Sequence, residues 1–355
     1  MKKTRIALAS LAAFSLLATA CGGDDDGDDS VSGDTTTDDT SGDTSGDTAA
    51  PGDTTAGTTG DTVDVVQGED ITIAVITHGD DGIFWSVAQK GAEQAGADLG
   101  ITVQYQGANN DAPTQAQMID AAVGQGVAGL VVSLADPSAL QDSVLAAVDA
   151  GIPVITINSG SDVYQEFGAI THVGQDEFIA GQGAGTRLAE AGGTNLLCVM
   201  QEQANVGLEA RCDGAEDTFG GSITRITTSG DADPTTSQQE IAAALDADDT
   251  IDAIFATGPV GAVLARNAVA DAGREVTIGS VDLSTDLLDA IEAGEIAFTI
   301  DQQQYLQGYL PVVMLYLNIT NANTTGGGLP VYTGPGFVDD SNVAEVKDLV
   351  AAGTR

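Results

Sequence analysis

The chain has 355 residues, and its 53 acidic and 11 basic side chains give a formal net charge of −42 at pH 7. This charge excludes a nucleic-acid-binding protein, which needs a basic surface, and it disfavours an anionic ligand unless arginines converge locally. A salt-adapted or simply soluble extracellular surface accounts for the acidity.

Residues 1–20 have the pattern of a bacterial lipoprotein signal peptide. The basic start MKKTR precedes the apolar stretch IALASLAAFSLLATA, which is shorter than a typical membrane-spanning helix. Small residues then precede Cys21, as in proteins lipidated at this cysteine, although Ala18 stands where leucine is more usual. We therefore expect an extracytoplasmic protein, anchored by Cys21 to the outer face of the cell membrane. A plain secretory signal is the alternative.

Residues 21–69 form a segment rich in Asp, Gly, Ser and Thr, with almost no large apolar residue and no Lys or Arg. Such a segment buries too little apolar surface to offset its ordering entropy, so we expect a disordered acidic tether. The Asp runs lack the spacing and closing Glu of a calcium loop. We predict no metal site and no cofactor.

Two cysteines remain beyond Cys21. Cys198 follows an apolar run in NLLCVM, and Cys212 lies in EARCDG, early in the next expected helix. An even pair in an oxidising compartment favours a disulfide, with two buried free thiols as the alternative. Neither cysteine is near a histidine in the sequence, so neither is expected to be catalytic.

From residue 70 onward, short apolar runs alternate with segments of helical length. We expect strands at 71–77, 102–107, 128–134, 152–158, 172–175, 195–200, 223–230, 252–258, 276–282 and 297–302. Glycines at the ends and prolines near the starts of the intervening segments are typical of helices. This alternation predicts an α/β protein, and its length suits two doubly wound parallel-sheet lobes. Ligands of such sheets bind beyond the carboxyl ends of the strands.

The chain resembles the ribose-binding-like, type I substrate-binding proteins of bacterial ABC importers. The pieces that carry this resemblance occur in order: IFWSVAQKGAEQAGADLGITV, DAGIPVITIN, HVGQDEFIAGQGAG, RCDG and IGSVDLSTDLLDAIEAGEIAFTIDQQQYLQGYLPV. The resemblance implies two lobes joined by a three-segment hinge and closing on a sugar-like ligand. It implies a first lobe of residues 70–174 plus 303–332, and a second lobe of residues 175–302 plus 333–350.

In the first lobe, Phe84 and Trp85 match the family's tandem aromatic positions after strand one, where rings cover the apolar face of a sugar. Packing of the first helix on its sheet is the alternative for both rings. Asn158, at the end of PVITIN, matches a position where many members have an Asp that accepts from hydroxyl groups. Asp81 and His78 are expected near the same site.

In the second lobe, Arg211 matches an arginine that donates to ligand oxygens; its alternatives are a helix cap or a pair with Glu209 or Asp213. Asp282 matches a carboxylate that follows a strand, with a helix N-cap as the alternative. Gln302 matches an amide near a hinge crossing. The segment GQGAG at 181–185 lacks the spacing of a dinucleotide fingerprint, so close helix packing is the interpretation.

Four residues at three places depart from ribose binders. Ser159 replaces a common arginine, Gly82 replaces an asparagine, and Gly258-Pro259 replaces an Asn-Asp pair. We therefore expect a ligand other than ribose, such as another pentose, a hexose, a deoxysugar or a polyol.

The prediction is a monomeric, lipid-anchored receptor that captures a sugar or polyol and delivers it to the transmembrane subunits of an ABC permease. A sugar sensor for a membrane receptor would have the same fold and is one alternative. An extracellular carbohydrate-active enzyme is the other, but the sequence has no nucleophile elbow, phosphate loop, metal-ligand cluster or marked carboxylate pair.

Overall fold

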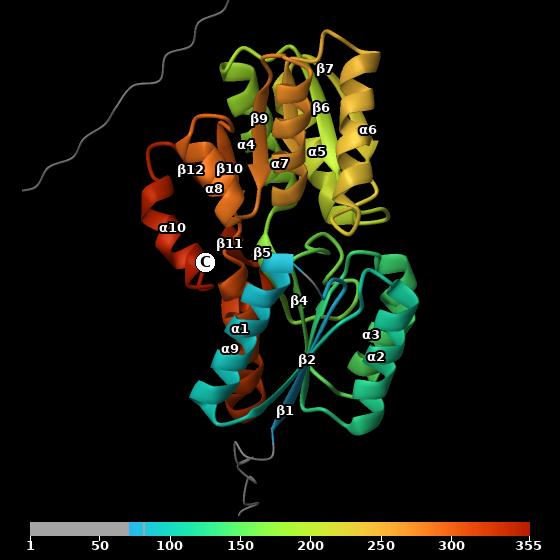
Figure 1. Ribbon diagram of the computed structural model, residues 1–355. Coiled ribbons are helices and arrows are strands. Elements are labelled where there is room, and N and C mark those ends of the chain that lie inside the picture. The colour runs from blue at the N-terminus through green and yellow to red at the C-terminus, as the bar shows by residue number, and fades with distance from the viewer. Residues whose placement is uncertain (1–70, 81) are drawn as a thin grey trace, which may run out of the picture. The chain divides into compact units, whose positions relative to one another are not determined.

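The computed structural model describes residues 71–80 and 82–355. The predicted signal peptide, Cys21, the predicted tether and Asp81 lie outside the described residues. The described part of the chain contains two six-stranded sheets, and each forms the centre of one lobe (Figure 1).

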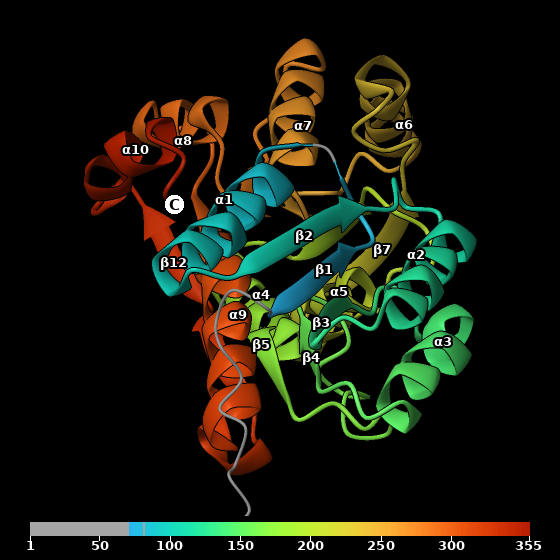
Figure 2. The same ribbon diagram turned by 90° about the horizontal axis from the view of Figure 1, so that it is seen from below.

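The sheet of the first lobe has the strand order β11-β5-β4-β3-β1-β2, and all its neighbouring strands are parallel. β1 and β2 lie side by side at one edge (Figure 2). The six strands are β1 (Thr72–Thr77), β2 (Thr102–Gly107), β3 (Gly129–Ser133), β4 (Val154–Ile157), β5 (Thr171–Gln175) and β11 (Val331–Gly334).

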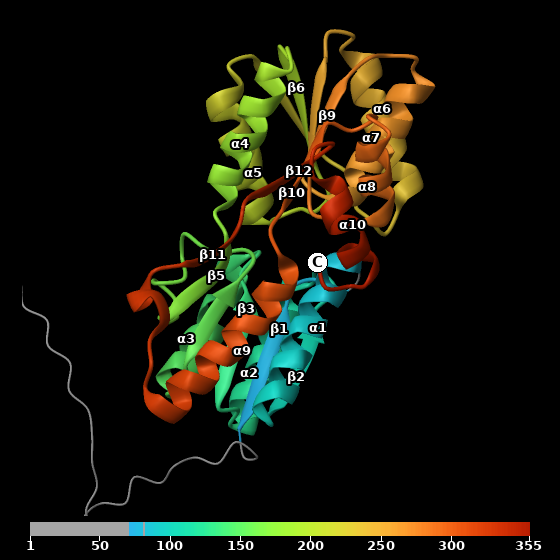
Figure 3. The same cartoon turned by 90° about the vertical axis from the view of Figure 1, so that its left-hand side faces the viewer.

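Helices cover both faces of this sheet, because alternate residues of each strand point to opposite sides. Ile73 and Val75 of β1 belong to the core under α1 and α9, whereas Ala74 and Ile76 belong to the core under α2 and α3. Figure 3 shows these two helix layers. The helices are α1 (Gly82–Leu99), α2 (Ala112–Gln125), α3 (Pro137–Asp149) and α9 (Gln304–Asn321), and the short 3-10 helix η2 (Thr325–Gly328) follows α9.

The sheet of the second lobe repeats this strand order, as β12-β10-β9-β8-β6-β7. Its strands are parallel except β12, which pairs antiparallel with β10. The six strands are β6 (Asn195–Met200), β7 (Ser222–Thr227), β8 (Ala253–Ala256), β9 (Thr277–Val281), β10 (Phe298–Asp301) and β12 (Gly336–Asp339).

The second sheet also separates two apolar cores. One core gathers residues of α4 and α5, and the other gathers residues of α6, α7, α8 and α10. These helices are α4 (Glu177–Glu190), α5 (Val206–Phe219), α6 (Pro234–Ala247), α7 (Pro259–Asp271), α8 (Thr285–Glu292) and α10 (Val343–Ala351).

The segment GQGAG lies in α4, at the contact with α5. A Cβ atom on Gly181 would lie 2.1 Å from the carbonyl oxygen of Arg211, and one on Gly185 would lie 2.4 Å from the carbonyl oxygen of Ala215. Only glycine allows the two backbones to approach so closely. These glycines therefore serve helix packing, as predicted from the sequence.

The chain passes between the lobes at three places. Asp176 links β5 to α4, Gln302 and Gln303 link β10 to α9, and Pro335 links β11 to β12. The Gly334–Pro335 peptide bond is cis. Each lobe is thus assembled from segments that are far apart in the sequence.

The predicted fold, two doubly wound lobes joined by three crossings, is confirmed. The expectation of ten strands was incomplete, because β11 and β12 were missed. Each has four residues, and only Pro335 separates them. Segments this short and rich in Gly and Pro have no readable alternation of apolar and polar residues.

Candidate functional site: a polar cavity between the lobes

A cavity of about 620 Å³ lies between the carboxyl ends of the two sheets. The ligand-binding residues predicted from the sequence all line it, except Asp81, which lies outside the described residues. Its walls are formed by His78, Gly82, Ile83, Phe84, Trp85, Asn109, Asn110, Asn158 and Ser159 of the first lobe, and by Gln201, Glu202, Gln203, Asn205, Leu208, Arg211, Thr228, Ser229, Gly230, Asp231, Ala232, Pro259, Val260, Asp282 and Gln302.

The two aromatic rings lie in the first turn of α1. Trp85 makes edge contacts with Phe84 and with His78, at centroid distances of 4.7 and 4.8 Å. Trp85 is 7% exposed and packs in the core of the first lobe, and Phe84 is half-buried beside it. Core packing and a place in the cavity wall do not exclude each other for Trp85, because its side chain belongs to both.

His78 follows β1 and is fixed by Ser133. The backbone N–H of His78 donates to Ser133 Oγ at 2.8 Å, and Nδ1 lies 2.8 Å from the same oxygen. Burial lowers the pKa of His78, against an opposing effect of Glu202. The other ring nitrogen, Nε2, lies 3.6 Å from Glu202 Oε2 of the second lobe.

Asn158 follows β4 in a left-handed backbone conformation, with φ of 59°. Its side chain Nδ2 donates to Gln302 Oε1 at 3.4 Å, and Ser159 Oγ lies 3.1 Å from Asn158 Oδ1. Asparagine tolerates positive φ better than most residues. The first lobe thus contributes amide and hydroxyl groups to the cavity.

Arg211 lies in the second turn of α5 and is 3% exposed. Its Nε and Nη2 donate to Glu177 at 2.6 and 3.0 Å, and its Nη1 donates to the carbonyl oxygen of Thr257 at 2.7 Å. Burial alone would lower the pKa of Arg211, but Glu177 more than offsets this effect and raises the pKa. Two of the five N–H groups of the guanidinium remain for a ligand.

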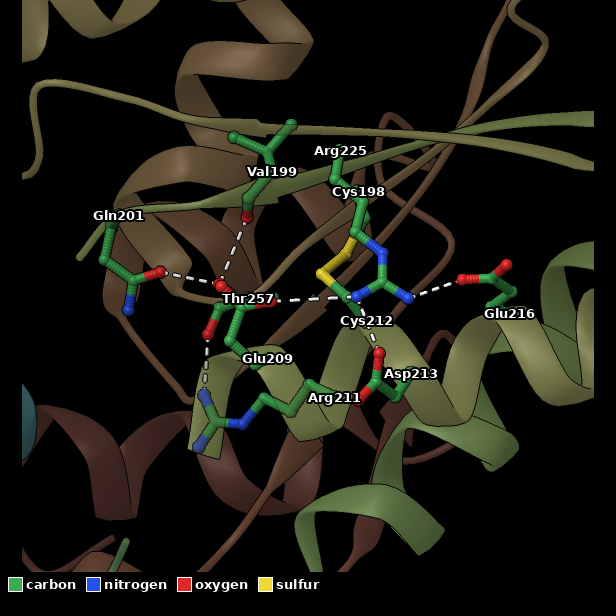
Figure 4. The surroundings of a disulfide bond; sticks show 10 residues. All are labelled: Cys198, Val199, Gln201, Glu209, Arg211, Cys212, Asp213, Glu216, Arg225 and Thr257. Carbon is green, nitrogen blue, oxygen red and sulfur yellow. Dashed lines mark hydrogen bonds and ion pairs between the residues drawn. A yellow bond between two sulfur atoms is a disulfide. The ribbon is translucent and has the colours of Figure 1, made fainter. Parts of the chain in front are cut away.

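The alternative partners considered for Arg211 were wrong. Asp213 and Glu209 instead face Arg225, at 2.6 and 3.7 Å, and Figure 4 shows the separate surroundings of Arg211 and Arg225. Glu177, the true partner of Arg211, was missed. The sequence indicates Glu177 only indirectly: a buried arginine needs a buried carboxylate, but nothing in the sequence says which one.

Asp282 follows β9 with φ of 69° and is 6% exposed. Burial raises the pKa of Asp282 to about 7, against the opposing effects of Arg211 and of the hydrogen bond from Gln302. The N-cap alternative was wrong, because Ser284 caps α8 by accepting from the N–H of Leu287. Asp282 is therefore available to the cavity.

Gln302 joins both lobes at the second crossing. Its Nε2 donates to Asp282 Oδ1 at 2.7 Å, and its Oε1 accepts from Gln307 at 2.9 Å and from Asn158 at 3.4 Å. The amide is almost fully buried. A single side chain therefore connects Asn158 of the first lobe with Asp282 of the second.

Sequence reasoning missed the loop after β6. Gln201, Glu202, Gln203 and Asn205 of this loop line the cavity, and Asn205 also caps α5. These loop residues show no periodic sequence pattern, because only the packing of the two lobes brings them to the cavity. Asn205 alone could have been predicted, as the N-cap of the following helix.

The disulfide predicted between Cys198 and Cys212 is present, and both cysteines are fully buried (Figure 4). It joins β6 to α5, and neither cysteine is among the residues that line the cavity. Among the described residues, no group of His, Cys, Asp and Glu could hold a metal ion. Within residues 71–80 and 82–355, no helix combines the length and apolarity needed to cross a membrane.

This combination defines a two-lobed solute-binding protein: two sheets of the same strand order, three crossings, and a polar cavity lined from both sides. Residues 73–323 match the periplasmic binding protein domain family, and the chain belongs to that family. The resemblance stated from the sequence is confirmed. The protein is a substrate-binding protein of the ABC-importer class.

Three relatives place the chain within this family. It is 27% identical to the xylose/arabinose-binding protein XylF of Sulfolobus acidocaldarius, over 76% of this chain and 71% of that protein. It is 27% identical to the ribose import binding protein RbsB of Haemophilus influenzae, over 68% and 83% of the two chains. A carbohydrate transporter of Acidothermus cellulolyticus 11B, solved in complex with myo-inositol, is 43% identical with a TM-score of 0.77, over 80% and 99% of the two chains.

Proposed function

We propose that this protein binds a neutral sugar or cyclic polyol in the cavity between its lobes and delivers it, chemically unchanged, to an ABC permease. Myo-inositol is the first candidate, because the 43% identical carbohydrate transporter was solved with this ligand. The observation that carries the proposal is the cavity itself, where aromatic, amide, carboxylate and guanidinium groups of both lobes converge. Its volume of about 620 Å³ is within the usual range of small-molecule sites.

The polar groups suit a ligand with many hydroxyls. Asp282 offers an acceptor, Arg211 offers the two N–H groups not used by the protein, and Asn158 offers both kinds of group. A hydroxyl both donates and accepts, so a ring of hydroxyls can satisfy such a mixed set. Sites of this kind reject analogues that leave a buried polar group unpaired.

The aromatic side of the cavity suits the C–H face of a ring. Phe84 is half-buried, with Trp85 beside it in an edge-to-face contact. An apolar ring face that covers Phe84 would lose water from both surfaces. A sugar or cyclitol presents such a face together with equatorial hydroxyls.

The charges of the cavity disfavour an anionic ligand. Arg211, the only Lys or Arg among the described residues that line the cavity, is already neutralised by Glu177 at 2.6 Å. Glu202, Asp231 and Asp282 line the same space. A ligand carboxylate or phosphate would face these side chains at a high electrostatic cost. Sugar acids and sugar phosphates are therefore expected to bind poorly.

The proposed role also includes attachment and assembly. We propose that Cys21 carries the lipid anchor, that the acidic segment 21–69 tethers the receptor to the outer face of the cell membrane, and that the receptor is a monomer. The lipoprotein-like pattern of residues 1–21 supports the anchor, although these residues lie outside the described part of the chain. The transmembrane subunits of the permease are the proposed partners.

Titration calorimetry with a defined panel tests the proposal. The panel contains myo-inositol, D-arabinose, D-allose, D-ribose and D-xylose, with D-glucuronate as the anionic control. We expect tight binding of a narrow neutral subset, a raised melting temperature with the same ligands, and no binding of D-glucuronate. If none of the neutral ligands binds and another class of solute raises the melting temperature, the sugar or polyol assignment is wrong.

A further inference from the structure

The segment between the two disulfide cysteines forms a large part of the cavity wall in the second lobe. Cys198 lies in β6 and Cys212 in α5, 14 positions apart, and their bond closes the chain between them into a loop. Six residues of this loop line the cavity: Gln201, Glu202, Gln203, Asn205, Leu208 and Arg211. The disulfide itself is fully buried and does not line the cavity.

The same loop also contacts the opposite lobe. The backbone N–H of Val206 donates to the carbonyl oxygen of Ala135, which follows β3 of the first lobe, at 3.1 Å. Asn205 Oδ1 lies 3.2 Å from Ser159 Oγ, just after β4. A Cβ atom on Gly207 would lie 2.9 Å from Ser159 Oγ, so the start of α5 is pressed close to the first lobe.

Two further side chains extend this contact. Asn205 Nδ2 donates to Glu202 Oε2 at 2.6 Å and lies 3.5 Å from His78 Nε2. Glu202 Oε2 itself lies 3.6 Å from His78 Nε2. Asn205 is buried at this contact. It connects Glu202 of the second lobe with Ser159 of the first, beside His78.

These contacts differ from those of the hinge. The hydrogen bonds of Gln302 lie at a crossing, where the chain already joins the lobes. Residues 201–206, in contrast, meet residues of the first lobe that precede them in sequence by 46 to 127 positions. Because these residues are not joined to the first lobe at a crossing, separation of the lobes would break their contacts.

We propose that residues 201–206, held at their base by the Cys198–Cys212 disulfide, form a latch that keeps the two lobes closed and slows the release of the ligand. The disulfide limits the conformations of the loop, so less ordering entropy is lost when the loop meets the first lobe. The latch rests on closure of the lobes and not on the identity of the ligand.

Two single variants test the latch from its two sides. Asn205→Ser keeps an N-cap residue for α5, because serine caps as well as asparagine, but its side chain is too short to span the contacts. Ser159→Ala removes the partner on the first lobe and leaves α5 unchanged. Glu209→Gln is the matched control, because Glu209 lies in the same disulfide-closed loop but is exposed and faces Arg225.

The first measurement needs no ligand. Small-angle X-ray scattering of the ligand-free protein should give a larger radius of gyration for Asn205→Ser and Ser159→Ala than for the natural protein and Glu209→Gln. Equal radii in all four proteins would overturn the latch. Because no ligand is present, this result stands whether or not the proposed sugar or polyol specificity is correct.

The second measurement uses myo-inositol as the probe in stopped-flow displacement. Release from the two latch variants should be about tenfold faster than from the natural protein, with association rates much less changed. Because Asn205 and Ser159 also line the cavity, faster release supports the latch only together with the larger radius of gyration of the ligand-free variants. Release rates equal to that of Glu209→Gln would overturn the role in ligand retention. Absence of myo-inositol binding by the natural protein would count against the proposed ligand, and scattering would still decide the latch.

The role of the disulfide is tested with the double variant Cys198→Ala/Cys212→Ala. Amide hydrogen exchange in residues 201–206 should accelerate by about tenfold or more, while exchange in the strands of the second sheet stays slow. The radius of gyration should increase as in the latch variants. Unchanged exchange in residues 201–206 together with an unchanged radius would show that the latch is independent of the disulfide.

Discussion

Arg211 and Glu177 form a bidentate ion pair in the interior of the second lobe, with Nε–Oε2 and Nη2–Oε1 distances of 2.6 and 3.0 Å. Each side chain is at most 4% exposed. Glu177 is the first residue of α4, directly after the first crossing, and Arg211 stands beside Cys212 on α5. The pair thus ties the hinge end of α4 to the wall of the cavity.

Removal of one partner from this pair should be strongly destabilising. Glu177→Gln leaves a buried guanidinium with hydrogen bonds but no countercharge, so we expect a loss of about 3–5 kcal/mol in the free energy of unfolding. Urea unfolding measures this loss. Glu216→Gln, in the exposed cluster around Arg225, is the matched control and should cost less than about 1 kcal/mol. Equal losses in the two variants would contradict the structural role of the buried pair.

The single tryptophan should report ligand binding directly. Trp85 lines the cavity, and it is the only Trp of the chain. A ligand that replaces water near the indole changes the polarity around it, so the tryptophan emission should shift on titration with myo-inositol or another bound sugar. Fluorescence titration and calorimetry should give the same Kd. A calorimetric signal without any change in emission would place the ligand away from the rings.

The two rings should respond differently to truncation. Phe84→Ala should weaken binding about tenfold or more, because the half-buried ring supplies contact area in the cavity, with a modest loss of stability. Trp85→Ala should also lower the free energy of unfolding by about 3–5 kcal/mol, because Trp85 packs in the core of the first lobe. Calorimetry and thermal unfolding of both variants separate these effects. An unchanged affinity of Phe84→Ala would remove that ring from the site.

Asp282 should make the ligand-free protein less stable as the pH rises. Its pKa is about 7 in the folded protein, compared with 3.8 as the ordinary value, so the folded state holds its proton more tightly between these two values. The penalty therefore develops from pH 4 to pH 7 and is complete above, with a size on the order of a few kcal/mol.

Asp282→Asn tests this dependence. The stability of the variant relative to the natural protein should increase from pH 4 to pH 7 and then stay constant, as measured by urea unfolding at each pH. Binding should be weakened at every pH, since asparagine lacks one acceptor. A pH-independent difference in stability would mean that Asp282 ionises normally in the folded protein.

His172 should make the folded protein less stable as the pH falls below 6.5. It is fully buried in β5, its Nδ1 lies 2.9 Å from Thr156 Oγ1, and burial lowers its pKa to about 3. The folded state therefore excludes the proton between pH 6.5 and pH 3, and stability falls as the pH falls through this window, by a few kcal/mol in total. His172→Gln should flatten this part of the stability curve. An unchanged slope would assign the acid sensitivity to carboxylates instead.

Much of the architecture could be predicted from the sequence. The alternation of apolar runs with helical segments predicted two doubly wound lobes, because each strand of a parallel sheet is buried on both faces. The two cysteines suggested a disulfide, and aromatic and polar residues after strand ends indicated a cavity there. These inferences succeeded because they depend on local periodicity and on the shared direction of parallel strands.

Contacts between distant segments were not readable. The packing of helices and lobes decides that Arg211 pairs with Glu177 and that Asn205 contacts Ser159. It also decides that Trp85 lies both in the core and in the cavity wall. Residue patterns along the chain were enough to predict the class of fold and the end of each sheet that faces the cavity, since both follow from local periodicity and from the direction of the strands. Only the tertiary structure decided which charges neutralise each other and which groups remain for the ligand, because pairing in a buried site depends on distances of a few ångströms between residues far apart in sequence.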